Sequence, residues 1–253
     1  MKNLIKKIKG TPITRNKDFA YDDYMENKTY YLQKIVCNLP VEKSNNLSQE
    51  KMAKCSEYGL KFVNYYFKSP LLSKTKAKIY LNEDIWLRQS ILIDLKTIDE
   101  ELKKHSLRLL ILSGYRHPVL QALIIRQVSK NYNQKLADKM FANPDNYAPH
   151  TSGAAFDLEI WDEKRHKVLP TKIFGIIDIF TLEEKVNLTL AEKEVRDNRR
   201  LIFNLLTQDI ILKADKVFVA HPFEYWHYGR HERMSAFFAA NGHKVFYDVI
   251  RQI

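Results

Sequence analysis

The sequence predicts an α+β fold with a central antiparallel sheet that is flanked by helices. Strand-like and helix-like segments both occur, but they do not alternate regularly as they do in parallel α/β folds. Residues 107–112 form a near-continuous apolar run, which is typical of a strand buried on both faces. Residues 154–161 alternate in polarity, which indicates a strand with one apolar face.

Size and composition are those of a globular protein. The chain has 253 residues, 45% of them hydrophobic and 12% aromatic, with 7 Gly and 8 Pro. This excludes collagen-like, low-complexity and wholly disordered chains. No repeat and no Pro/Gly/Ser-rich linker divides the sequence, so we expect one domain over residues 1–253 with an irregular N-terminal portion over about 1–45.

The first half of the chain contains two expected helices with a strand between them. We expect a helix at roughly 48–58 that ends near Gly59, and then a strand over 61–67. Asn82 is the expected N-cap of the clearest helix. The apolar residues of this helix recur at spacings of three and four and predict one buried stripe: Leu87, Ile91, Leu95, Ile98 and Leu102.

The strand at 107–112 leads into a turn, and Pro118 is suited to begin the next helix, which we expect over about 118–141. After the strand at 154–161, the charged residues 162–167 fit a hairpin turn. The remaining expected elements are a helix, a strand, a short helix and a final strand. They lie at about 190–208, at 216–220, at about 231–240 and at the end of the chain.

Charge and cysteine content indicate which broad class of protein this is. The net charge is +11, from 41 basic and 30 acidic residues. Binding to nucleic acid is one explanation of this charge, but the basic residues are scattered and no RNA- or DNA-binding motif accompanies them, so we expect a generally basic surface and no nucleic-acid partner. Cys37 and Cys55 lack CxxC spacing and are too few for a disulfide framework. We expect two buried thiols, with a single bridge between them as the alternative.

The sequence shows neither a secretory signal nor an apolar stretch long enough to span a membrane. We therefore expect a soluble, cytoplasmic protein, with export by an unconventional route left open.

Candidate metal ligands lie within and just before the strand expected at 154–161. Asp157 shares one side of this strand with Ala155, whose small side chain leaves room beside the carboxylate. Gly153 permits a sharp turn that brings His150 back over the strand. His and Asp are ordinary zinc ligands, and a catalytic zinc site needs three protein ligands and one open position.

Two further segments complete a hydrolytic site. His227 is the expected third ligand, and Glu224, three residues earlier, is placed to act as general base on an attacking water. Arg116 follows the 107–112 strand and is suited to stabilise the oxyanion of a tetrahedral intermediate.

This combination resembles the zinc D-alanyl-D-alanine dipeptidases and their relatives, the zinc D,D-carboxypeptidases of bacterial cell walls. The family pattern is S-x-H-x-x-G-x-A-x-D, then E-x-W-H, with G-Y-R upstream. The chain matches it in order and separation over roughly residues 75–230. The matching residues are Gly114-Tyr115-Arg116, His150, Gly153, Ala155, Asp157, Glu224, Trp226 and His227. The segment Asn198-Arg199-Arg200-Leu201 also looks like the dipeptidase branch.

The resemblance implies one zinc ion per chain. It implies His150, Asp157 and His227 as metal ligands, Glu224 as general base and Arg116 as transition-state stabiliser, which are the roles that the residue types themselves suggest.

Two departures concern the substrate. The family Ser two residues before the first ligand is Ala148 here, so a polar contact to the substrate is lost. The dipeptidase branch also has an acid after the hairpin that receives the substrate ammonium, whereas the segment 173–178 has no acid before its glycine. Asp162 and Asp178 are the available candidates.

The sequence thus predicts a zinc metallopeptidase that hydrolyses D-alanyl-D-alanine or a related D-amino-acid dipeptide. One alternative is a zinc D,D-carboxypeptidase acting on peptidoglycan stem peptides. Another is a catalytically inactive peptide-binding module of the same fold, although such a module has no need of Glu224.

Overall fold

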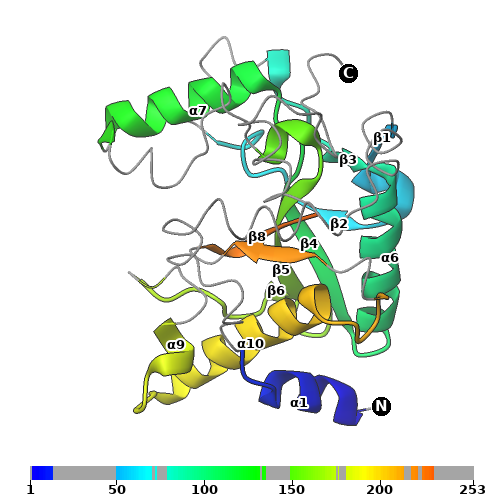
Figure 1. Cartoon of the computed structure of the whole chain (residues 1–253), viewed down its shortest axis with the longest axis vertical. Coiled ribbons are helices and arrows are strands. Elements are labelled where there is room, and N and C mark those ends of the chain that lie inside the picture. The colour runs from blue at the N-terminus through cyan, green and yellow to red at the C-terminus, as the bar shows by residue number, and fades with distance from the viewer. Residues whose placement is uncertain are drawn as a thin grey trace, which may run out of the picture.

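The computed structural model describes residues 2–13, 50–69, 72, 79–131, 133–134, 149–174, 176, 181–213, 218–221 and 224–230. It confirms a mixed α+β architecture in which a six-stranded sheet occupies the middle of the molecule (Figure 1). The strand order is β2-β4-β5-β8-β7, with β6 paired to the end of β5. The strands of this sheet are β2 (Lys61–Phe62), β4 (Leu107–Ser113), β5 (Ala155–Asp162), β6 (Lys167–Val168), β7 (Val219–His221) and β8 (Glu224–Gly229).

The predicted antiparallel sheet is correct for four of the strand pairs and wrong for one. β2 pairs with β4 in parallel, whereas the other strands of this sheet pair antiparallel. The reason is the long connection between β2 and β4, which contains helix α6 (Gln89–Lys103) and returns the chain to the same end of the sheet. A separate two-stranded sheet joins β1 (Met52–Lys54) to β3 (Trp86–Arg88).

Helices cover the sheet on several sides. Figure 1 shows α7 (Pro118–Asn131) above the sheet, α6 alongside it, and α10 (Leu190–Thr207) with α1 (Lys2–Gly10) below it. The shorter helices are η3 (Cys55–Tyr58), η5 (Pro149–Ser152) and α9 (Thr181–Glu184). No described helix is long and apolar enough to cross a membrane.

The main core lies between the apolar face of β5 and the helices α6 and α10. Phe156, Leu158 and Ile160 are fully buried on β5, as the predicted alternation requires. The stripe on α6 is also confirmed, because Ile91, Leu95, Ile98 and Leu102 are all 0% exposed. The opposite face of β5, which carries Asp157, is therefore available for chemistry.

Three expected boundaries are wrong. Residues 52–58 form β1 and the 3-10 helix η3, and the chain does turn at Gly59, whose φ is +66°. The helix expected from Asn82 begins only at Gln89, because residues 86–88 pair with β1 as strand β3. The expected strand over 61–67 is limited to 61–62.

The N-terminal portion is not irregular throughout. Residues 2–10 form α1, which packs on α10 with Ile8 2% exposed. Cys55 is buried with a free thiol. The rest of the irregular portion, Cys37, most of 132–141 and everything after residue 230 lie outside the described residues.

Candidate metal centre

The pairing of β5 with β8 places two of the predicted ligands side by side. Asp157 is the register partner of His227, so both side chains point from the same face of the sheet. The neighbouring strand β4 contributes Ser113, which faces Asp157 from the other side. Residues 70 positions apart in sequence therefore meet in the middle of the sheet.

The third predicted ligand comes from the loop before β5. His150 lies in η5, and Gly153 reverses the chain at φ +72°, a conformation that favours glycine. The backbone N–H of Arg116 donates to the His150 carbonyl at 3.1 Å. The Nδ1 of His150 lies 2.7 Å from the Gly114 carbonyl, which can only accept, so Nδ1 carries the proton and Nε2 presents a lone pair.

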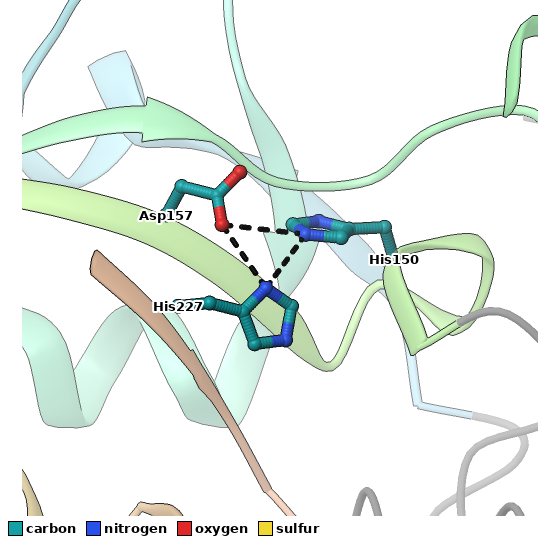
Figure 2. Close-up of side chains that lie close together, drawn as sticks. All are labelled: His150, Asp157 and His227. Carbon is teal, nitrogen blue, oxygen red and sulfur yellow. Dashed lines mark hydrogen bonds and ion pairs between the residues drawn. The ribbon is translucent and has the colours of Figure 1, made fainter. Parts of the chain in front are cut away.

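The three side chains converge on one point (Figure 2). His150 Nε2 lies 3.1 Å from His227 Nδ1, and His227 Nδ1 lies 3.1 Å from Asp157 Oδ1. The third edge, from His150 Nε2 to Asp157 Oδ1, measures 3.5 Å. In the part of the chain that the structure describes, this is the single group of three such residues close enough to share a metal ion.

The size of this triangle fits a zinc ion. Tetrahedral geometry with bonds of about 2.0–2.2 Å puts neighbouring ligand atoms roughly 3.3–3.6 Å apart. The three measured edges match this spacing to within a few tenths of an ångström, and two nitrogens with one carboxylate oxygen form a typical donor set of catalytic zinc. The residues thus fit the metal that the sequence predicts.

Protonation states also suit a metal. Burial and the nearby Arg116 guanidinium lower the pKa of His150 to about 4, so its ring is neutral at pH 7. Burial opposes ionisation of Asp157, but the adjacent imidazoles and Arg116 hold the pKa of this carboxyl well below its usual range. At neutral pH the cluster therefore offers a neutral imidazole and a carboxylate, the forms that bind metal.

Arg116 lies within the cluster and is fixed by four contacts. Its Nη2 donates to Asp157 Oδ2 at 2.6 Å, its Nε donates to Ser113 Oγ at 3.0 Å and its Nη1 donates to Gln121 Oε1 at 3.4 Å. The guanidinium carbon lies 4.5 Å from the centre of the Tyr66 ring. Arg116 therefore occupies one carboxylate oxygen of Asp157 and leaves the other to face the histidines. Its role as transition-state stabiliser stays a prediction.

Glu224 begins strand β8 at the edge of the same cluster. Its Oε2 lies 3.9 Å from His227 Nδ1, and its side chain is 14% exposed. It is too far away to belong to the tight triangle but close enough to exchange a proton with a water held there. The structure thus brings all five predicted site residues together.

Sequence reasoning missed Arg88, which supports the His150 loop. This side chain on β3 is 2% exposed, and its Nε and Nη1 donate to the carbonyls of Ser152 at 2.8 Å and Glu50 at 2.6 Å. The backbone N–H of Arg88 also donates to the Gly153 carbonyl at 3.0 Å. The one sequence signal for this role is a basic residue directly after the short apolar segment 85–87.

Replacing Arg88 with Ala is expected to loosen this loop and weaken metal binding. Loss of a buried, hydrogen-bonded guanidinium leaves two carbonyls without donors, so the free energy of unfolding should fall by about 3 kcal/mol. Urea denaturation and zinc titration measure both effects. Arg165→Ala is the control, because the Arg165 side chain is 62% exposed and its loss should change stability by less than about 0.5 kcal/mol. Unchanged zinc affinity in Arg88→Ala contradicts this role.

One of the two candidate acids for the substrate ammonium, Asp162, lies away from the described site. Asp162 accepts from the backbone of Lys164 and Arg165 and so caps the β5–β6 turn. It is five residues from Asp157 along β5, roughly 17 Å at 3.4 Å per residue. Asp178 and the substituted position Ala148 lie outside the described residues.

Comparison with known proteins gives limited similarity. No family model matches the chain, and no curated protein matches it. Among solved structures, the LdcB LD-carboxypeptidase, whose structure concerns peptidoglycan recognition, is 20% identical, with 72% of each chain covered and a TM-score of 0.32. The D,D-dipeptidase VanXYg, solved with a D-Ala-D-Ala phosphinate analogue, is 19% identical over 77% of this chain and 72% of that chain, with a TM-score of 0.34. Similarity at this level establishes neither the family nor the activity of this chain.

Proposed function

We propose that this chain is a zinc-dependent peptidase that hydrolyses D-alanyl-D-alanine or a related D-amino-acid dipeptide. The observation that carries the proposal is the buried triangle of His150 Nε2, Asp157 Oδ1 and His227 Nδ1, with edges of 3.1–3.5 Å. A zinc ion bound by such a triangle supplies Lewis-acid polarisation of a carbonyl and acidifies water. The motif resemblance supplies the substrate class, and the geometry supports a hydrolytic site.

The chain's own residues then have distinct tasks. Glu224 takes a proton from the attacking water and returns it to the leaving amine, because its carboxylate lies at the edge of the cluster. Ser113 and Gln121 hold the guanidinium of Arg116, whose charge is positioned to stabilise a developing oxyanion. His150 is oriented by the Gly114 carbonyl, which is the kind of outer partner that fixes a ligating imidazole.

The second candidate function is a zinc D,D-carboxypeptidase acting on peptidoglycan stem peptides. The observation that favours it is the position of Asp162, which caps a distant turn and so does not lie beside the described site to receive a dipeptide's free ammonium. A buried ammonium without a counter-charge is unfavourable by several kcal/mol. A longer, acylated peptide avoids this cost.

Relative cleavage of D-Ala-D-Ala and N-acetyl-D-Ala-D-Ala separates these two functions. We expect the free dipeptide to be cleaved, with rejection of the acetylated form weaker than about 10³-fold, because the predicted acid Asp162 caps a distant turn. The measurement is kcat/KM for both substrates with the zinc-loaded protein. Rejection by more than about 10³-fold contradicts this expectation, and equal or better cleavage of the acetylated form assigns the protein to the carboxypeptidases.

A further inference from the structure

A polar pocket lies beside the metal centre and shares two residues with it. The pocket is small and partly open to solvent. Arg116 and Ser113 form its inner wall, and the segments 64–66 and 80–86 form much of the rest. Because Arg116 also contacts Asp157, a peptide that occupies the metal centre has the pocket directly adjacent to it.

The two parts are rigidly joined through the turn that carries Arg116. The backbone N–H of Tyr115 donates to the Trp86 carbonyl at 2.8 Å. A Cβ on Gly114 would lie 2.6 Å from Ile85 Cγ2 and 2.7 Å from the Trp86 oxygen, so only glycine permits this close approach. The pocket wall at 84–86 is therefore held in a fixed position relative to the metal ligands.

The described residues that line the pocket include one acid and one base. Among them, Asp84 is the single carboxylate and Arg116 is the single basic side chain. Arg116 already donates to Asp157 at 2.6 Å, so its guanidinium is directed towards the metal centre. Lys54 lies over the Trp86 ring at 5.2 Å but does not line the pocket. Among the described lining residues, Asp84 therefore gives the outer wall a negative charge.

Backbone hydrogen bonds to one of its two oxygens orient the Asp84 carboxylate. Its Oδ1 accepts from the backbone N–H groups of Ile85 at 2.7 Å and Ser56 at 3.4 Å. These bonds fix the side chain, and Oδ2 has no partner among the residues that the structure describes. The side-chain amides of Asn64 and Asn82 belong to the same lining, together with the rings of Tyr66 and Tyr80. Carboxylate, amide and aromatic groups together suit a protonated amine.

We propose that this pocket binds an ammonium group of the peptide substrate, with Asp84 as its counter-charge. The inference rests on the proposed function and deepens it by naming the group that the site selects. An ammonium can come from the free N-terminus of a dipeptide or from the side chain of a lysine that precedes D-Ala-D-Ala. The chemistry is the same in both cases, and the substrates below separate them.

The experiment compares each ammonium substrate with its acetylated form, using zinc-loaded full-length protein. The first pair is D-Ala-D-Ala and N-acetyl-D-Ala-D-Ala. The second pair is Nα-acetyl-L-Lys-D-Ala-D-Ala and its Nα,Nε-diacetyl form. For at least one pair, the wild type should prefer the ammonium form by about 10- to 100-fold, the range for a hydrogen bond to a charged group. The pair that shows the preference identifies the source of the ammonium.

Asp84→Asn keeps the size and the Oδ1 acceptor but removes the charge, so the preference should fall to within about threefold of unity. Glu83→Gln is the matched control, because Glu83 is exposed, adjacent in sequence and absent from the pocket lining, and its preference should equal that of the wild type. Asn82→Asp adds a second carboxylate to the lining and should raise the preference for the ammonium substrate several-fold. This variant tests the inference if Asp84→Asn fails to fold.

Retained preference in folded Asp84→Asn overturns the inference, as does a wild type without preference in either pair. An unchanged or lower preference in Asn82→Asp also overturns it. The two variant results leave the proposed function intact, since the wild type still cleaves. A wild type that cleaves N-acetyl-D-Ala-D-Ala as well as the free dipeptide is instead assigned to the carboxypeptidases, which remain zinc-dependent peptidases. If the zinc-loaded wild type cleaves none of the four peptides, the proposed function is wrong and the inference falls with it.

Discussion

Replacing His150 with Ala is expected to remove both zinc and peptidase activity. His150 Nε2 is one corner of a three-ligand triangle, and the remaining Asp157 and His227 would have to hold the ion alone. Loss of one of three protein ligands should lower zinc affinity by several orders of magnitude, so the purified variant should contain almost no zinc and show no measurable turnover. Elemental analysis and a D-Ala-D-Ala assay on the same sample measure the two quantities.

The control for this variant is His166→Asn. His166 is an exposed residue of the β5–β6 turn with φ +49°, a conformation that Asn also adopts readily. Its zinc content and kcat should equal those of the wild type. Full zinc occupancy in His150→Ala would contradict the assignment of the metal centre, whatever the activity of that variant.

The site was predictable because its residues carry both local and pairwise signals. Asp157 stands out as a charged residue on a strand whose other face is apolar, and the pairing of β5 with β8 then sets it opposite His227. The position of Gly153 accounts for the return of His150 over the strand. Each of these follows from strand period and backbone conformation, which the sequence encodes locally.

The parts that could not be predicted depend on long-range pairing. Residues 86–88 continue the apolar period of α6, but pairing with β1 makes them a strand, and no local signal distinguishes the two outcomes. The parallel pairing of β2 with β4 likewise depends on where the connection between them runs. Arg88 could not be assigned to the His150 loop because its partners are carbonyls, and every residue has one.

The contact between Arg116 and Asp157 also depends on long-range structure and could not be predicted. The sequence predicts both residues at the site, but it does not reveal that Arg116 Nη2 donates to Asp157 Oδ2. That contact divides the carboxylate between two partners, with Oδ1 facing the histidines. Arg116, which also lines the adjacent pocket, is therefore already paired with Asp157. For this reason we assign the binding of an ammonium group in that pocket to Asp84.

Glu224→Gln is expected to separate metal binding from catalysis. The Glu224 carboxylate lies 3.9 Å from His227 Nδ1, outside the triangle whose edges are 3.1–3.5 Å, so the amide should leave zinc bound. An amide cannot accept the proton of the attacking water at neutral pH, so kcat should fall by about 10²–10⁴. KM for D-Ala-D-Ala should change little, because the shape of the side chain is kept.

Zinc content, kcat and KM together decide the role of Glu224, with Glu57→Gln, an exposed acid of η3, as the matched control. Wild-type kcat in a zinc-loaded Glu224→Gln protein would show that another group takes the proton. Loss of zinc from the same variant would show instead that Glu224 is itself a ligand, and that the triangle of His150, Asp157 and His227 is incomplete without it. Only retained zinc with greatly reduced kcat agrees with a general base beside a three-ligand metal site, because the two functions then reside in different side chains.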